Sequence, residues 1–205
     1  MRRPRLLVTG FGPFPGVPVN PCEPLIDALA AERPGLATAR LTTLWTAPGQ
    51  VAEMAARANL VLMFGVAAGE RRIRYERVAL PDVTAAPDAA GAMPSGRRLS
   101  YRASRLPVPM LAKAARRAGF PVRVSHSPGR YICNAAYGAA LANNPKTLFV
   151  HIPLPNRHGP LSADGLVRHA LWLVDRLSQH APGQAAIPAR RTAPPPPGQA
   201  GLRGW

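Results

Sequence analysis

Short apolar runs alternate along the chain with stretches in which apolar residues recur every three or four positions. Runs that end at glycine or proline are typical of buried strands, and the helical spacing is typical of amphipathic helices. The predicted strands are residues 5–9, 38–45, 60–64, 72–80, 121–124 and 148–152. The predicted helices are residues 24–31, 48–58, 109–118, 134–143 and 162–179. This alternation predicts an α/β domain with helices packed on a sheet.

Two segments do not follow the pattern. Residues 82–106 have weak periodicity and many Ala, Gly, Pro and Arg, so we expect a long loop of the kind that is commonly functional or mobile. Residues 181–205 contain four consecutive prolines and lack acidic residues, which predicts an unstructured or polyproline-II-like tail. The expected organisation is therefore a single domain over residues 1–180 followed by a tail over residues 181–205.

The chain is strongly basic, with 26 Lys and Arg against 10 Asp and Glu and a formal net charge of +16. Such a charge permits binding to nucleic acid. The arginines are spread from Arg2 to Arg203, however, and a coding bias that replaces lysine by arginine explains them as well. A basic nucleic-acid-binding protein is therefore kept as an alternative of another class, although the absence of a nucleic-acid motif argues against it.

Localisation signals are weak. No apolar run approaches the ~18 residues of a membrane-spanning helix, and the apolar stretch after the basic N-terminus is too short for a signal peptide. The two cysteines, Cys22 and Cys133, make no disulfide framework, and no Cys/His spacing suggests a zinc site. We expect a cytoplasmic protein with free thiols, no metal and no membrane partner.

Cys133 is a candidate nucleophile because it follows a glycine-bearing loop and opens an alanine-rich predicted helix. At such a position the helix dipole and the free backbone N–H groups lower a thiol pKa and can hold an oxyanion. A small buried core residue is the alternative.

His151 and Glu76 each lie in a strand-like run, where a polar side chain needs a reason. A thiol nucleophile requires a base, and the base requires a group that orients it. Taken alone, His151 fits a satisfied core histidine and Glu76 fits a surface carboxylate paired with a neighbouring arginine. Their spacing does not show whether the three residues meet.

Four segments taken together resemble pyroglutamyl peptidase I, a cysteine peptidase family. They occur in the family's order, at residues 7–14 with 19–21, 75–79, 131–134 and 149–153. The resemblance covers about residues 5–178. It implies a three-layer α/β/α sandwich around a mixed, mostly parallel sheet. It also implies removal of an N-terminal pyroglutamyl residue from small peptides without a cofactor, by a monomer or a homo-oligomer.

The resemblance also assigns roles to residues. Cys133 would be the nucleophile, with its backbone N–H at the oxyanion, His151 the base and then the acid, and Glu76 the group that orients the imidazole. The implied substrate-binding residues are Phe11 and Phe14 as an apolar clamp on the lactam, Asn20 near the ring amide, and Val66 near the substrate. Loop packing by the two phenylalanines and turn formation by Asn20 are the alternative interpretations.

Several positions depart from the family's pattern. Ala85 or Ala86 stands where an arginine is expected to help at the oxyanion, and Arg97 or Arg98 is a candidate to replace it. Val66 stands where many members have glutamine, and Glu70 where an arginine is common. These departures leave open a divergent relative that acts on another small N-acyl or lactam amide, or that has lost activity.

Overall fold

The computed structural model of the chain describes residues 5–14, 16–94 and 100–179, so the tail predicted over residues 181–205 lies outside the described residues. The strands are β1 (Leu7–Phe11), β2 (Ala37–Leu41), β3 (Val61–Val66), β4 (Ile73–Glu76), β5 (Val78–Ala79), β6 (Arg102–Ala103), β7 (Val122–Ser125) and β8 (Thr147–Ile152). The helices are α1 (Cys22–Glu32), α2 (Ala47–Arg57), α3 (Val108–Arg117), α4 (Ile132–Asn143) and α5 (Ala163–Gln179).

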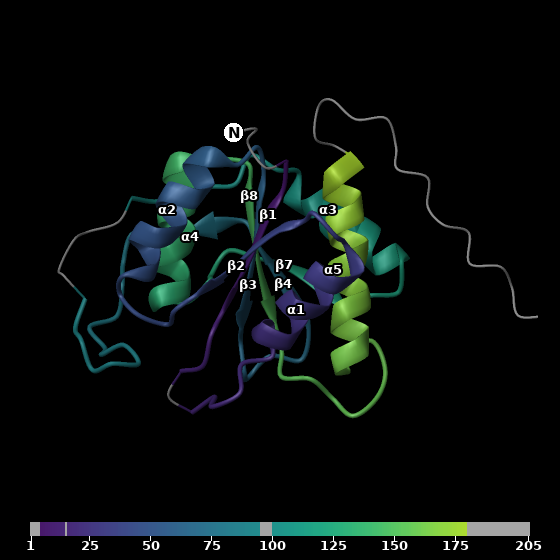
Figure 1. Cartoon of the computed structure of the whole chain (residues 1–205), viewed down its shortest axis with the longest axis horizontal. Helices are drawn as coiled ribbons and strands as arrows, with labels where there is room; N and C mark the ends of the chain where they lie inside the picture. The colour runs from purple at the N-terminus through teal and green to yellow at the C-terminus, as the bar shows by residue number, and fades with distance from the viewer. Residues whose placement is uncertain (1–4, 15, 95–99, 180–205) are drawn as a thin grey trace, which may run out of the picture.

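Six strands form one sheet in the order β2-β1-β3-β8-β4-β7. All neighbours are parallel except β4 and β8, which are antiparallel. Helices α2 and α4 cover one face of the sheet, and α1, α3 and α5 cover the other (Figure 1). The prediction of a single three-layer α/β/α domain around a mixed, mostly parallel sheet is confirmed.

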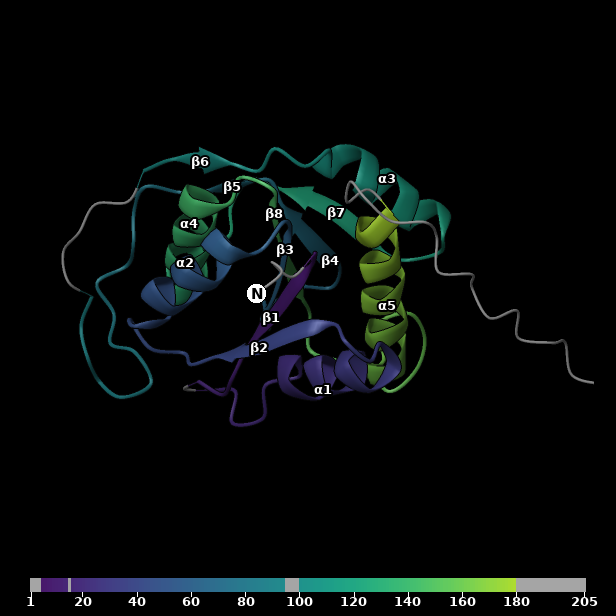
Figure 2. The same cartoon turned by 45° about the horizontal axis from the view of Figure 1, so that its top comes forward.

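The run predicted as one strand over residues 72–80 is divided in the structure. The chain leaves the main sheet after β4, and β5 pairs instead with β6 in a two-stranded antiparallel ladder that packs against α4 (Figure 2). β6 lies inside the segment expected to be a continuous loop. Alternation of apolar and polar residues holds only in β4, because Val78 and Ala79 of β5 are both apolar and buried. The sheet that each piece joins is set by pairing with strands far along the chain, which periodicity does not report.

Two strand boundaries also differ from the prediction. The strand predicted over residues 38–45 ends at Leu41, because the chain turns there into α2. The first strand runs past residue 9 to Phe11, so Gly10 belongs to the strand rather than to a loop. Glycine is required there because a Cβ would stand 2.7 Å from Ile26 Cγ1 of the covering helix.

Strand alternation sends polar residues toward α4. On β8, Val150 and Ile152 pack beneath α1, α3 and α5, whereas Phe149 packs toward α2 and α4. His151 lies two residues after Phe149 and therefore faces the same layer. By the same alternation, Tyr75 of β4 packs beneath α1, α3 and α5, and Glu76 faces α4.

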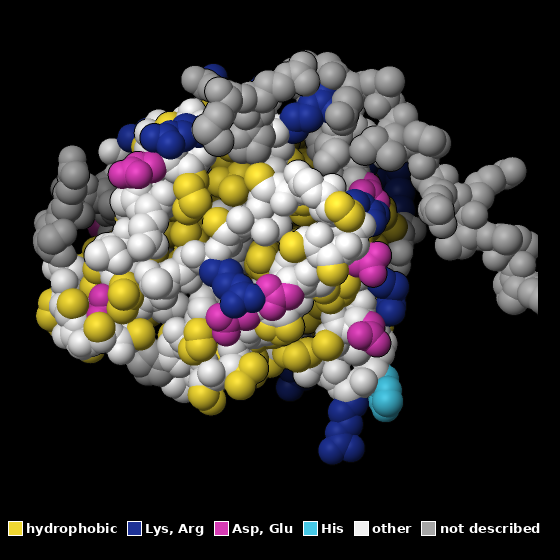
Figure 3. Space-filling model, in the orientation of Figure 1, with side chains coloured by type: hydrophobic (Ala, Val, Ile, Leu, Met, Phe, Trp, Pro, Cys, Tyr) yellow, Lys and Arg dark blue, Asp and Glu magenta, His cyan; other side chains and the backbone are white. Residues whose placement is uncertain are grey.

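The surface charges are dispersed on the face shown in Figure 3, where several Lys and Arg side chains lie beside Asp and Glu. Arg33 forms an ion pair with Asp175 at 2.7 Å, and Arg40 pairs with Asp27. Within the described ranges, no helix is long and apolar enough to cross a membrane.

A wholly buried histidine, His169 of α5, packs against Tyr75 of β4 and against Phe120, which follows α3. Its Nε2 is 2.8 Å from the Tyr75 hydroxyl, and its ring packs edge-on against Phe120 with centroids 5.1 Å apart. Its Nδ1 has no hydrogen-bond partner among the described residues. Burial lowers the pKa of His169 to about 3, so the folded protein holds this ring neutral.

His169 should make the fold sensitive to mild acid. The unfolded chain protonates this ring below about pH 6.5, whereas the folded chain does not until about pH 3. Its contribution is therefore complete above pH 6.5 and is lost as the pH falls toward 3. The expected loss in free energy of unfolding between pH 7 and pH 5 is about 2 kcal/mol. Urea unfolding at both pH values measures this loss.

The matched variants are His169→Gln, which stays neutral and can still bond Tyr75, and His158→Gln, which removes an exposed imidazole. The first should lose about 2 kcal/mol less than wild type between the two pH values. The second should lose as much as wild type. Equal losses in all three proteins would contradict the role of His169.

Candidate active site

A pocket opens at the carboxyl ends of β1, β3 and β8, where ligands commonly bind in open α/β sheets. Its volume is about 240 Å³, below the ~300–1000 Å³ common for drug-sized ligands, so it suits a small group. The lining residues are Phe11, Phe14, Asn20, Thr43, Val66, Ala67, Arg74, Pro128, Gly129, Tyr131, Cys133 and His151. The pocket thus contains six of the seven site residues predicted from the sequence, and Glu76 lies directly behind His151.

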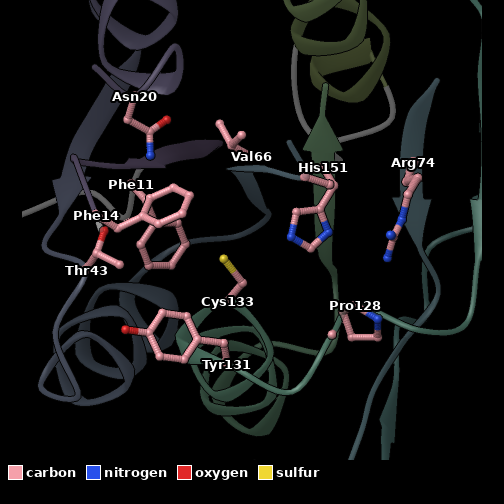
Figure 4. Close-up of a pocket in the computed structure, with 12 residues that line it drawn as sticks. Phe11, Phe14, Asn20, Thr43, Val66, Arg74, Pro128, Tyr131, Cys133 and His151 are labelled. Carbon is pink, nitrogen blue, oxygen red and sulfur yellow. The ribbon is translucent and has the colours of Figure 1, made fainter. Parts of the chain in front are cut away.

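Cys133 lies in the first turn of α4, as its sequence context predicts. The next residue, the buried Asn134, holds this turn in place. Its Oδ1 accepts the Leu80 N–H at 2.7 Å, and its Nδ2 donates to the carbonyls of Leu80 and Asp82 at 3.0 Å. The thiol therefore projects from a fixed helix end into the pocket (Figure 4).

The ionisation of Cys133 differs from the expectation. Burial raises the pKa of the thiol to about 12, and the negative charge of Glu76 acts in the same direction. Only the contact with its own backbone N–H lowers the pKa, and this effect is the smaller one. Loss of solvent around the half-buried sulfur thus opposes formation of the thiolate.

His151 lies at the end of β8 and faces the pocket beside the thiol (Figure 4). Its Nδ1 is 2.9 Å from Glu76 Oε1. Burial lowers the pKa of His151 below its ordinary value, although the hydrogen bond and charge of Glu76 oppose the shift. The imidazole is therefore neutral at pH 7 and carries its proton on Nδ1, since a carboxylate accepts there.

Glu76 is completely buried at the end of β4, and its Oε1 is also 2.6 Å from Arg74 Nη2. Burial opposes ionisation of this carboxyl, but the hydrogen bond and charge of His151, with the charge of Arg74, lower its pKa below the usual range. The structure thus brings Cys133, His151 and Glu76 together in that order across α4, β8 and β4.

Aromatic side chains form the opposite end of the pocket. Phe11 is buried at the end of β1 and Phe14 is half-buried in the following loop, with both rings near the thiol (Figure 4). Asn20 is completely buried and ties this loop down, because its Nδ2 donates to the Gly12 carbonyl at 2.7 Å and its Oδ1 accepts the Cys22 N–H at 2.9 Å. One donor hydrogen and one acceptor lone pair of its amide remain for a ligand.

Of the positions that depart from the family's pattern, Val66 lies in the pocket, whereas Ala85 and Ala86 lie outside it. Ala85 is exposed, and the carbonyl of Ala86 accepts the Trp45 Nε1–H at 3.2 Å. Arg97 and Arg98, the candidates for a replacement guanidinium, lie outside the described residues.

Six further pocket residues were missed by the sequence reasoning, namely Thr43, Ala67, Arg74, Pro128, Gly129 and Tyr131. Pro128, Gly129 and Tyr131 belong to the loop before Cys133, so closeness to the nucleophile segment was an available signal. Thr43 was assigned to a strand that in fact ends before it. Arg74 was one arginine in a dense basic run, and nothing in that run distinguishes it.

Comparison with known proteins agrees with this architecture. A model of the pyroglutamyl peptidase family matches residues 4–158. The pyrrolidone-carboxylate peptidase of Streptomyces coelicolor is 34% identical over 190 residues, which cover 82% of this chain and 88% of that protein. The chain therefore belongs to the pyroglutamyl peptidase family.

Solved structures support the same assignment. The pyrrolidone carboxyl peptidase from Thermus thermophilus superposes with a TM-score of 0.67 at 28% identity, over 86% of this chain and 99% of that one. The enzyme from Thermococcus litoralis, at 21% identity, shows the shared fold alone, with a TM-score of 0.74 over 86% and 93% of the two chains.

Gly65, opposite His151 in the register of β3 and β8, should tolerate no side chain. An alanine Cβ there would stand 2.8 Å from Phe149 Cζ and 3.3 Å from Cys133 Sγ, and Phe149 is fully buried. Because overpacking a filled core is costly, Gly65→Ala should lower the free energy of unfolding by about 1–3 kcal/mol. Urea denaturation measures this loss.

Gly69→Ala is the matched control, because a Cβ there meets nothing within 4 Å. Its effect should stay within about 1 kcal/mol of wild type. Equal stabilities of the two variants would contradict the tight packing around the sulfur.

Proposed function

We propose that this protein is a cysteine peptidase that removes an N-terminal pyroglutamyl residue from peptides through a thioester on Cys133. One observation carries the proposal: in a member of this family, a thiol and a carboxylate-bound imidazole face the same small, partly aromatic pocket. The thiol can attack, the imidazole can move its proton, and the pocket can hold a small neutral ring.

The proposed reaction begins from a neutral pair. With the pKa of Cys133 raised and that of His151 lowered, the uncharged thiol and imidazole are favoured over a preformed thiolate–imidazolium pair. Because Nδ1–H of His151 is bound to Glu76, Nε2 is the nitrogen left to take the thiol proton. General-base removal of that proton thus accompanies attack.

In the first step the Cys133 sulfur bonds to the carbonyl carbon of the pyroglutamyl group, and its proton passes to His151 Nε2. Glu76 stabilises the imidazolium, which then gives that proton to the leaving amine as the C–N bond breaks. In the second step water attacks the thioester and gives a proton to His151. Pyroglutamic acid leaves, and the thiol recovers its proton.

The substrate would enter with its ring among the aromatic side chains. Phe11 and Phe14 supply apolar contact, and the free hydrogen-bonding positions of Asn20 suit a lactam N–H or C=O. The developing oxyanion would be held by the Cys133 backbone N–H, since N–H groups in the first turn lack helical partners. With alanine at residues 85 and 86, loss of one such donor is expected to cost about 10²–10³ in rate unless another group replaces it.

A second candidate activity follows from Val66. This apolar side chain lines the pocket where many family members are expected to carry an amide. A divergent member would accept another small N-acyl or lactam amide with the same nucleophile. The thiol would then react with such substrates while pyroglutamyl amides remain intact.

The setting of the activity is part of the proposal. We place the peptidase in the cytoplasm, where a free thiol nucleophile stays reduced, and we regard small peptides with an N-terminal pyroglutamate as its substrates. Homo-oligomer formation stays a prediction from the family resemblance.

Cys133→Ala should abolish turnover, because alanine offers neither a nucleophile nor a proton for His151. The assay is release of a fluorophore from a pyroglutamyl amide under reducing conditions. Activity should fall by at least about 10³-fold, as expected when a covalent nucleophile is lost. The melting temperature should stay close to that of wild type.

Cys22→Ala is the matched control, since Cys22 is fully buried and does not line the pocket. It should retain turnover. Turnover retained in Cys133→Ala, or lost in both variants with the fold intact, would contradict the assignment of the nucleophile.

A further inference from the structure

Arg74 of β4 lies beside His151 of β8, directly opposite it on the neighbouring strand. β4 and β8 are antiparallel, and their register pairs Arg74 with His151 and Glu76 with Phe149. Residues opposite one another in such a pair share a face, so the guanidinium is directed to the layer that holds the imidazole. Its side chain is only 12% exposed, whereas its neighbours Arg71 and Arg72 are exposed.

The guanidinium of Arg74 contacts two carboxylates, those of Glu76 and Glu70. Nε donates to Glu76 Oε1 at 2.8 Å, and Nη2 forms an ion pair with the same oxygen at 2.6 Å. Nη1 donates to Glu70 Oε1 at 3.0 Å. Nη2 also donates to the carbonyl of Ser127, in the loop that leads to Cys133. The side chain is therefore fixed from three directions.

Glu70 extends the network to the surface. Its carboxylate accepts a hydrogen bond from Arg123 Nη2 at 2.7 Å. Burial alone would raise the pKa of Glu70, but the hydrogen bonds and charges of Arg74 and Arg123 lower it below its ordinary value. Side-chain exposure falls from 41% at Arg123 through 27% at Glu70 to 0% at Glu76. The acidic residue that departs from the family's pattern thus orients an arginine toward the buried carboxylate.

We propose that Arg74 is a positioning residue for the peptidase reaction: it holds the Glu76 carboxylate in the orientation that meets His151 Nδ1. This inference rests on the proposed function only in naming the reaction that the imidazole serves. One oxygen, Oε1, receives both the imidazole and the guanidinium, so moving Arg74 moves the acceptor of the His151 hydrogen bond. A charge-assisted pair of this kind is short and directional.

A substrate-binding role fits Arg74 less well, although it lines the pocket. Figure 4 shows His151 between Cys133 and Arg74, so the guanidinium is on the far side of the imidazole from the thiol. Its charge is already balanced by Glu70 and Glu76. An additional carboxylate from a substrate would compete with partners that are already in place.

The kinetic test compares Arg74→Gln with Arg72→Gln, which removes the same charge from an exposed side chain two residues away. If Glu76 is held by Arg74, Arg74→Gln should lower kcat about 10- to 100-fold and change KM less than about threefold. Arg74→Lys should recover part of kcat, because it keeps the charge without the fork of donors. Arg72→Gln should match wild type.

A second readout needs no substrate. The charged groups that face His151 are Glu76 and Arg74 on β4 and Glu70 on the loop before it. The titratable Cys133 thiol faces it from α4. The hydrogen bond and charge of Glu76 raise the pKa of His151, and the charge of Arg74 lowers it by a smaller effect. If Arg74 holds Glu76 in place, this pKa should therefore fall in Arg74→Gln, whereas loss of charge alone would raise it. The pKa should stay near the wild-type value in Arg74→Lys and Arg72→Gln. NMR titration of the imidazole nitrogens measures it, with His151→Gln identifying the signal.

The proposal is overturned if Arg74→Gln leaves kcat at the value of Arg72→Gln, or if it leaves the His151 pKa unchanged or raises it. A rise in KM with kcat unchanged would also overturn it, because that pattern belongs to a substrate contact. If wild type and every variant release no fluorophore, the proposed peptidase activity fails. The NMR titration then still decides whether Arg74 controls the His151–Glu76 pair.

Discussion

The antiparallel placement of β4 beside β8 is the constraint on which the site depends. In the otherwise parallel sheet, this reversal sets Arg74 opposite His151 and brings Glu76 within 2.9 Å of the imidazole. A parallel β4 would run in the opposite direction past the end of β8. One strand reversal therefore places both the carboxylate that contacts the imidazole and the guanidinium that contacts the carboxylate.

Burial shifts the pKa values of the Cys133 thiol and the His151 imidazole. Desolvation favours the neutral thiol, because it raises the pKa of Cys133, and the neutral imidazole, because it lowers the pKa of His151. Of Cys133, His151 and Glu76, the carboxylate is the group that favours the charged form, because Arg74 and His151 both bind its Oε1. The proposed chemistry then creates charge only during attack, when the imidazolium faces an ionised carboxylate.

The sequence predicted the alternation of strands and helices well, since period and turn residues are local properties. It also identified Cys133 at a helix start from the loop and the alanine-rich stretch around it. It could not show that residues 72–80 divide between two sheets, because the division depends on pairing with β6, β7 and β8, which lie far along the chain. Nor could it separate Arg74 from the exposed arginines beside it, because that distinction comes from register with a strand about 75 residues later.

The central claim is that Cys133 carries the acyl group. The most direct measurement is acid quenching of the enzyme during turnover of a pyroglutamyl ester, followed by mass spectrometry of its peptides. The account predicts a pyroglutamyl adduct on the peptide that contains Cys133, absent from Cys133→Ala and still formed in Cys22→Ala. Turnover with no adduct on that peptide, or with an adduct on Cys22, would contradict it.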